Sequence, residues 1–234
     1  YLCSGNLRND AMKASILYLL FAFILAPISG TLFAQEAGNR VYLFDSFKPA
    51  TVKMKNGSKA SASFNYDGSK REMVYYDKEQ LMVLDGLEQV DTIFIENRKF
   101  VPFQQKFREV VPLTEGELQI DWSMKRIFLG KKGAFGQVSH SGTVQNINPG
   151  YLTGYLSTQH SNEGSNQVYS TVLKNTYYLV QKSKPRKFNS LKTFMSQFPE
   201  NQQTQLTDFI KNEKVDFNVP EDVVKLAGFA VTLE

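Results

Sequence analysis

The residues that most invite a catalytic interpretation are Ser139, His140 and Ser141, with a second histidine at His160. A serine beside a histidine resembles a nucleophile beside its base. In an extended chain, however, adjacent side chains point to opposite faces, and catalytic triads are assembled from distant segments. The serine motif G-x-S-x-G does not occur in the sequence. We therefore predict no nucleophilic catalysis at these residues.

Metal and phosphate sites find equally little support. His140 and His160 are separated by a long polar segment, and no carboxylate accompanies either one at helical ligand spacing, so no metal site is predicted. Residues 130–136 place two lysines among three glycines. A phosphate-binding loop needs a Gly-Lys-Ser/Thr ending, or G-x-G-x-x-G between a strand and a helix. Neither is present, so we predict a flexible loop and no cofactor.

Three carboxylates, Glu115, Glu117 and Asp121, have the residue type of a glycosidase pair. Such a pair needs a separation set by the substrate and two opposed environments. Glu115 and Glu117 flank the turn residue Gly116, so we interpret these carboxylates as solvated strand ends.

Aromatic residues offer the better binding candidates. Tyr is suited to sites with one dry side and one wet side, but it is also a favoured strand residue. Tyr177 and Tyr178 must face opposite ways in a strand, so at least one of them is expected in the core. Tyr151 and Tyr155 lie beside turn-forming Pro and Gly residues and are predicted to be exposed binding residues. The other aromatic residues of this set are Trp122 and Tyr169.

Composition bounds the class of protein. The chain has 234 residues, of which 42% are hydrophobic and 21% charged, which is typical of a globular protein. A net charge of +4 does not indicate a nucleic-acid partner. The single cysteine, Cys3, excludes a disulfide framework. The basic segment 182–187 could meet anionic surface polymers, but it is interpreted as a solvated, proline-containing connector.

The first 34 residues predict export. Lys13 supplies a positive charge, residues 16–26 are uniformly apolar, and Ala34 stands before Gln35 as a small residue at a cleavage site. We expect residues 1–34 to be an N-terminal extension plus a signal peptide, with the start at Met12 and cleavage near Ala34. An uncleaved anchor is the alternative, but a span needs about 20 apolar residues. The mature chain would be free of cysteine and of membrane spans, and would lie in the periplasm, at the cell surface or outside the cell.

Residues 35–187 are predicted to form a β-rich domain. Ala60, Ala62, Phe64 and Tyr66 alternate with polar residues, which is typical of a half-buried strand. A three-residue loop at 56–58 would pair Val52 with Ala62. A two-residue loop at 67–68 would pair Ala62 with Met73. The spacing of the strands without helical periods between them favours an antiparallel meander, a sandwich or an open barrel.

Residues 188–234 are predicted to form a helical tail. Leu191, Phe194, Met195 and Phe198 follow helical spacing after a cap at Asn189 or Ser190. The same spacing recurs after Pro199 and again after Pro220. The fold class is therefore α+β, mainly β, with a small C-terminal helical segment.

The order of these parts resembles a group of uncharacterised secreted or periplasmic proteins of the Bacteroidota. The similar sequence segments are LFAQ at 32–35, RKFVPF at 98–103, FREVV at 107–111, NTYYLV at 175–180 and the tail at 190–226. The resemblance covers most of residues 35–234 and contains no catalytic signature. It implies an exported location and no established activity, and it transfers no functional residue.

These observations predict an exported, non-catalytic protein that binds a protein or a glycan of the cell envelope. A secreted hydrolase whose site is assembled from distant residues is the first alternative. A purely structural envelope component is the second.

Overall fold

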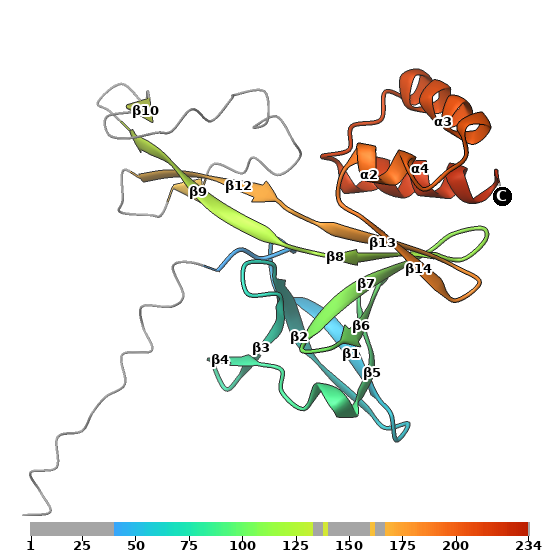
Figure 1. The fold of residues 1–234 in the computed structure, drawn as a ribbon. Helices are drawn as coiled ribbons and strands as arrows, with labels where there is room; N and C mark the ends of the chain where they lie inside the picture. Colours follow the sequence, from blue (N-terminus) through green and yellow to red (C-terminus); the bar gives the residue numbers. More distant parts are fainter. Residues whose placement is uncertain (1–39, 133–137, 140–159, 162–166, 234) are drawn as a thin grey trace, which may run out of the picture. The chain divides into compact units, whose positions relative to one another are not determined.

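A computed structural model describes residues 40–132, 138–139, 160–161 and 167–233, and strands dominate the described part of the chain (Figure 1). The strands are β1 (Lys48–Met54), β2 (Lys59–Asp67), β3 (Glu72–Asp77), β4 (Gln80–Val83), β5 (Val90–Ile95), β6 (Arg98–Phe103), β7 (Lys106–Pro112), β8 (Glu117–Asp121), β9 (Met124–Lys132), β10 (Val138–Ser139), β11 (His160–Ser161), β12 (Gln167–Leu173), β13 (Thr176–Gln181) and β14 (Lys184–Phe188). The helices are the 3₁₀ turn η3 (Leu87–Gln89), α2 (Leu191–Met195), α3 (Glu200–Glu213) and α4 (Pro220–Val231).

The strands form two antiparallel sheets. Ten strands are ordered β14-β13-β8-β7-β6-β5-β1-β2-β3-β4, and four more are ordered β10-β9-β12-β11. The large sheet is not closed into a barrel, and three small helices follow near the C-terminus. The predicted α+β, mainly β fold with antiparallel strands and a helical segment at its end is confirmed.

A single long ribbon of two strands passes through both sheets. In Figure 1, β8 continues into β9, and β12 continues into β13. β8 pairs with β13 from Val180↔Glu117 to Thr176↔Asp121, and β12 pairs with β9 from Leu173↔Met124 onward. The register is the same on both sides of the junction, so the two sheets share one continuous pair of strands until a shift between Val168 and Tyr169.

Hydrogen bonds outside the ladder satisfy backbone groups where the ribbon leaves the large sheet. The Ser123 amide donates to Oδ1 of Asn175 at 3.1 Å, and the Met124 amide donates to the Gly68 carbonyl at 2.8 Å. The Trp122 carbonyl accepts from the Tyr66 hydroxyl at 3.2 Å. Because buried backbone groups need partners, these bonds permit the ribbon to pass from one sheet to the other.

An ion pair lies within the core beside this junction. Arg98 donates to both carboxylate oxygens of Glu109, at 2.7 and 2.5 Å, and the Trp122 indole N–H donates to Oε2 of Glu109 at 2.6 Å. The Arg98 guanidinium also lies 5.1 Å from the Trp122 ring centroid. Glu109 is buried, and three charge-assisted hydrogen bonds compensate for the lost hydration of its carboxylate.

The helices pack on the face of β13 and β14 that carries Tyr177. The ring of Phe188 lies 4.9 Å from that of Phe194 in α2, and Tyr177 lies 5.7 Å from Phe217 in the connection before α4. Ser190 caps α2 by accepting from the Thr193 amide, in a reciprocal capping box, as one of the two predicted caps. The buried residues of α4 share one apolar stripe and comprise Pro220, Val223, Leu226, Ala227, Ala230 and Val231.

The first hairpin has the predicted three-residue loop, but it begins one residue earlier. The loop is 55–57, and Val52 pairs with Ala60 instead of the predicted Ala62. Gly57 has φ +86°. In three-residue hairpin loops the left-handed residue occupies the last position, so the glycine fixes the loop one residue earlier.

The second hairpin contradicts the predicted two-residue loop. The loop is 68–71, and Met73 pairs with Tyr66 instead of Ala62. Oδ1 of Asp67 accepts hydrogen bonds from the amides of Ser69 and Lys70, at 2.9 and 3.2 Å. This side-chain cap stabilises a wider turn than the Asp-Gly pair alone would form.

Replacing Gly116 by alanine is expected to destabilise the fold by about 2–4 kcal/mol, because two costs add. Gly116 has φ +93°, and an added Cβ would lie 2.2 Å from the Val180 carbonyl oxygen. Gly57→Ala is the matched control, since Gly57 has φ +86° but no atom within 4 Å of such a Cβ. It should cost about 1 kcal/mol. Urea unfolding measures both, and equal losses would contradict the close approach at Gly116.

The fold is also expected to lose stability in alkali. Burial raises the pKa of the Tyr177 hydroxyl to about 12. The unfolded chain binds this proton less tightly, with a pKa of about 10, so the stabilisation is complete below pH 10 and declines as the pH rises toward 12. Tyr177→Phe should flatten the decline in unfolding free energy between pH 10 and 12. Tyr76→Phe, at an exposed tyrosine, should leave it unchanged.

Candidate functional site

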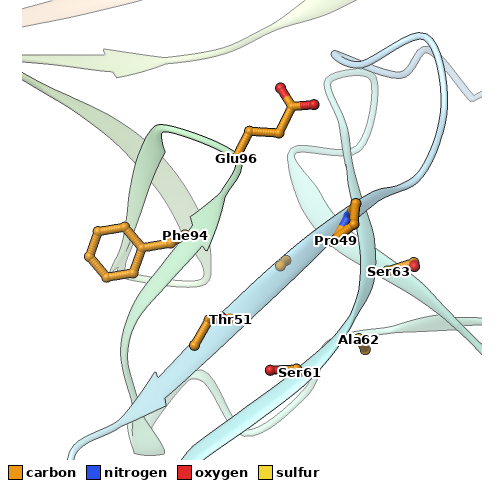
Figure 2. Close-up of a pocket in the computed structure, with 8 residues that line it drawn as sticks. Pro49, Thr51, Ser61, Ala62, Ser63, Phe94 and Glu96 are labelled. Atoms are coloured by element: carbon orange, nitrogen blue, oxygen red, sulfur yellow. The ribbon is translucent and has the colours of Figure 1, made fainter.

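A shallow groove of about 420 Å³ lies on strands β1, β2 and β5 of the large sheet (Figure 2). Its lining residues are Pro49, Ala50, Thr51, Ser61, Ala62, Ser63, Phe94 and Glu96. Most of these side chains are small, so the sheet surface is hollow between the larger residues at its border. The groove is within the size range of small-molecule sites.

The strand register brings the groove residues together. Thr51 of β1 pairs with Phe94 of β5 on one side and with Ser61 of β2 on the other. Alternate residues of a strand share a face, so Pro49 and Ser63, which pair with each other, lie beside this row. A phenyl ring and three hydroxyl groups therefore occupy one face of three adjacent strands.

Phe94 is the most unusual of these residues. Its side chain is 42% exposed, whereas its neighbours in β5, Ile93 and Ile95, are fully buried. Figure 2 shows the ring of Phe94 extending from its strand at the border of the groove. An exposed aromatic face beside hydroxyl groups can stack on an apolar sugar face while the hydroxyls form hydrogen bonds.

Glu96 supplies the charge of the groove. It occupies a turn position with φ +53°, and its Oε1 lies 3.8 Å from Nζ of Lys48. Among the described residues that line the groove, Glu96 is the sole titratable group. Glycoside hydrolysis requires two carboxyl groups, and nucleophilic catalysis requires a nucleophile activated by a base. The groove has the chemistry of binding and lacks the paired groups of either mechanism.

Arg108, on the same side of the sheet, is enclosed by aromatic rings. The guanidinium of Arg108 lies 3.4 Å from the Phe103 ring centroid and 3.6 Å from that of Tyr178, and it donates to Gln119 at 3.1 Å. Burial lowers the pKa of Arg108. Because both of its faces are covered by rings, Arg108 serves the packing of β6, β7 and β13.

The predicted binding residues Tyr151 and Tyr155 lie outside the described residues, as do His140 and Ser141. Ser139 is in β10 and His160 is in β11, the two outer strands of the four-stranded sheet. The backbone positions of these two residues are therefore separated by β9 and β12.

The tyrosine prediction for β13 is confirmed. Tyr177 is buried and Tyr178 is half-buried on the other face, against Arg108. Trp122 is buried beside Glu109, and Tyr169 lies on the ribbon with Arg126 4.1 Å from its ring centroid.

The prediction of solvated carboxylates is wrong for Asp121. Glu115 is exposed, and Glu117 accepts a hydrogen bond from Gln119 at 2.7 Å. The Asp121 side chain is only 15% exposed, with Oδ1 3.8 Å from Nε of Arg71. The turn after β2 brings Arg71 to Asp121, and this long-range contact was not visible in the local pattern.

Two predicted irregular segments are strands in part. Residues 130–132, predicted as the beginning of a flexible loop, belong to β9, while residues 133–137 lie outside the described part. The predicted connector 182–187 consists of a two-residue turn, with φ +48° at Lys182 and +62° at Ser183, followed by β14. Pro185 is compatible with β14 because this strand is at the edge of the sheet.

Other classes of site find no support in the described residues. No three side chains of His, Cys, Asp or Glu converge closely enough there to hold a metal ion. None of the helices in the described part of the chain combines the length and hydropathy that crossing a membrane requires.

Comparison with protein-family models, with curated proteins and with solved structures finds no match to this chain.

Proposed function

We propose that this chain is an exported, non-catalytic protein that binds a glycan of the cell envelope through the groove on β1, β2 and β5. The observation that carries the proposal is the exposed ring of Phe94 in register with the hydroxyl groups of Thr51 and Ser61.

A glycan fits this groove better than other ligand classes. A sugar ring has an apolar face that stacks on an aromatic ring and an equatorial belt of hydroxyls that exchange hydrogen bonds. Ser61 and Ser63 are exposed and are not engaged in any side-chain hydrogen bond that the described residues make with one another. Glu96 adds a carboxylate that accepts from sugar hydroxyls.

Export is the second part of the proposal, and its support is the leader pattern of residues 12–35. A glycan ligand agrees with a destination in the periplasm, at the cell surface or outside the cell. The likeness to exported proteins of the Bacteroidota points the same way and remains a prediction.

The groove proposal predicts that Phe94→Ala weakens glycan binding about tenfold, because the stacking surface is lost. The measurement is isothermal titration of the full chain against neutral hexasaccharides of glucose, xylose, mannose and N-acetylglucosamine. Ser61→Trp should fill the groove and weaken binding similarly, with the free energy of unfolding changed by no more than about 0.5 kcal/mol.

Phe128→Ala is the matched control, since Phe128 is 45% exposed but lies on β9, outside the groove. It should bind as the original chain does. Binding that survives both Phe94→Ala and Ser61→Trp, or the lack of any bound neutral glycan, would reject the groove as the site.

The export proposal predicts a mature protein that begins at Gln35. N-terminal peptide mass spectrometry of the protein recovered from envelope and extracellular fractions of its native cells measures this end. A mature product that still contains residues 16–26 would contradict cleavage, whatever the outcome of the glycan titrations.

A further inference from the structure

A second exposed aromatic ring lies on the face of the sheet that carries the groove. We propose that Tyr76 of β3 is a second stacking platform, so that the site takes an internal segment of a linear, neutral polysaccharide. This inference rests on the proposed glycan function. Tyr76 is 50% exposed, compared with 42% for Phe94, and it lies just outside the residues that line the groove.

The strand register places Tyr76 beside the groove. Phe64 of β2 pairs with Tyr75 of β3. The next residues along these strands, Ser63 and Tyr76, are therefore neighbours on the face opposite to buried Phe64. Ser63 pairs in turn with Pro49 of β1, and both of these residues line the groove. Tyr76 thus extends the surface of the groove by one strand.

The two rings stand at diagonal ends of this surface. Phe94 ends one row of side chains at β5, and Tyr76 ends the adjacent row at β3, with β1 and β2 between them. Figure 2 shows Phe94 and Ser63, the neighbour of Tyr76, on opposite sides of the groove. Three interstrand spacings and an offset of two residues amount to about 16 Å along the sheet. A disaccharide is too short for this distance, whereas a longer chain can contact both rings.

Aromatic packing holds the Tyr76 ring in position. The ring centroid of Tyr76 lies 4.6 Å from that of Phe47, and Phe47 meets Tyr42 edge to face at 5.5 Å. Half of the surface of Tyr76 nevertheless remains exposed and available to a ligand. A side chain that is already held in the free protein loses less conformational entropy on binding.

The surface between the rings favours an internal segment of a chain over its end. The lining residues there are small, and Pro49, Ser61 and Ser63 are exposed. In the described part of the chain, the borders of this surface are exposed rings rather than walls, so a polysaccharide can continue past both of them. Hydroxyl groups exchange hydrogen bonds with a neutral sugar and need no charge on it.

The test titrates the full chain with hexasaccharides and disaccharides of glucose, xylose, mannose and N-acetylglucosamine. A hexasaccharide that binds should do so at least about tenfold more tightly than its disaccharide, because it gains a second stacking contact. Tyr76→Ala should reduce this preference to about twofold, since only the contact with Phe94 is left.

Two further variants serve as controls. Tyr76→Phe keeps the ring and should restore the preference for the longer chain. Met82→Ala is the matched control, since Met82 is 39% exposed on β4 but pairs with Tyr75 and therefore lies on the other face of the sheet. It should leave both affinities unchanged. Circular dichroism spectra that match the original chain verify that each variant is folded.

The outcomes separate this inference from the groove proposal. Hexasaccharide binding that falls with Phe94→Ala but not with Tyr76→Ala would overturn the second platform and leave the groove as the site, as would equal affinities for the two chain lengths. A dimer in light scattering that Tyr76→Ala converts to a monomer would assign the ring to a contact between copies and overturn the platform. Failure to bind any of these glycans would overturn both proposals.

Discussion

The pairing of residues 117–132 with residues 167–180 is the constraint on which both sheets depend. It supplies β8 and β13 to the large sheet and β9 and β12 to the small one, in a single register across the junction. At that junction Asn175 and Gly68 accept hydrogen bonds from the ribbon amides, and the Tyr66 hydroxyl donates to the Trp122 carbonyl. A hypothetical Cβ on Gly68 would lie 2.5 Å from Cγ of Met124, so any larger residue at this position would require the Met124 side chain to move. The ribbon is thus held where the chain bends out of the core.

The two faces of the large sheet differ in their surroundings. The face that carries Ile93, Phe100 and Tyr177 is buried within the common core with the helices. The opposite face is left for surface functions, and its character changes from strand to strand. At β6, β7 and β13 it is closed by the stack of Phe103, Arg108 and Tyr178. At β1 and β2 its side chains are short, and there the groove forms. The groove is therefore a consequence of side-chain size on a rigid surface and needs no movable loop.

Local pattern was sufficient for most strands, for the helices and for a cap at Asn189 or Ser190, because alternation, helical spacing and capping are properties of neighbouring residues. It missed β14 and the end of β9, which were predicted as a connector and a flexible loop. It was insufficient where distant segments meet. Asn65 alternates with apolar residues and so belonged to the expected polar face, yet it is buried and bonds to both the amide and the carbonyl of Phe44. The groove was missed for a similar reason. The run of Ala and Ser at 60–63 was visible, but Phe94 joins it only because β1 lies between β5 and β2, an order that local pattern does not reveal.

The excess of basic residues between Asp121 and Glu200 was missed for a different reason. The net charge of +4 is a sum over the whole chain and does not show how the charges are distributed along it. The ion pairs that stabilise the fold do not depend on this uneven distribution of charge. Several ion pairs of the described residues join or lie beside strands of the large sheet, such as Arg40 with Asp67 and Arg98 with Glu109. On the ribbon, Lys125, Lys131 and Lys174 are exposed. Within the described residues, the groove presents the exposed ring of Phe94 beside hydroxyl groups and one carboxylate, which suits the proposed binding of a glycan.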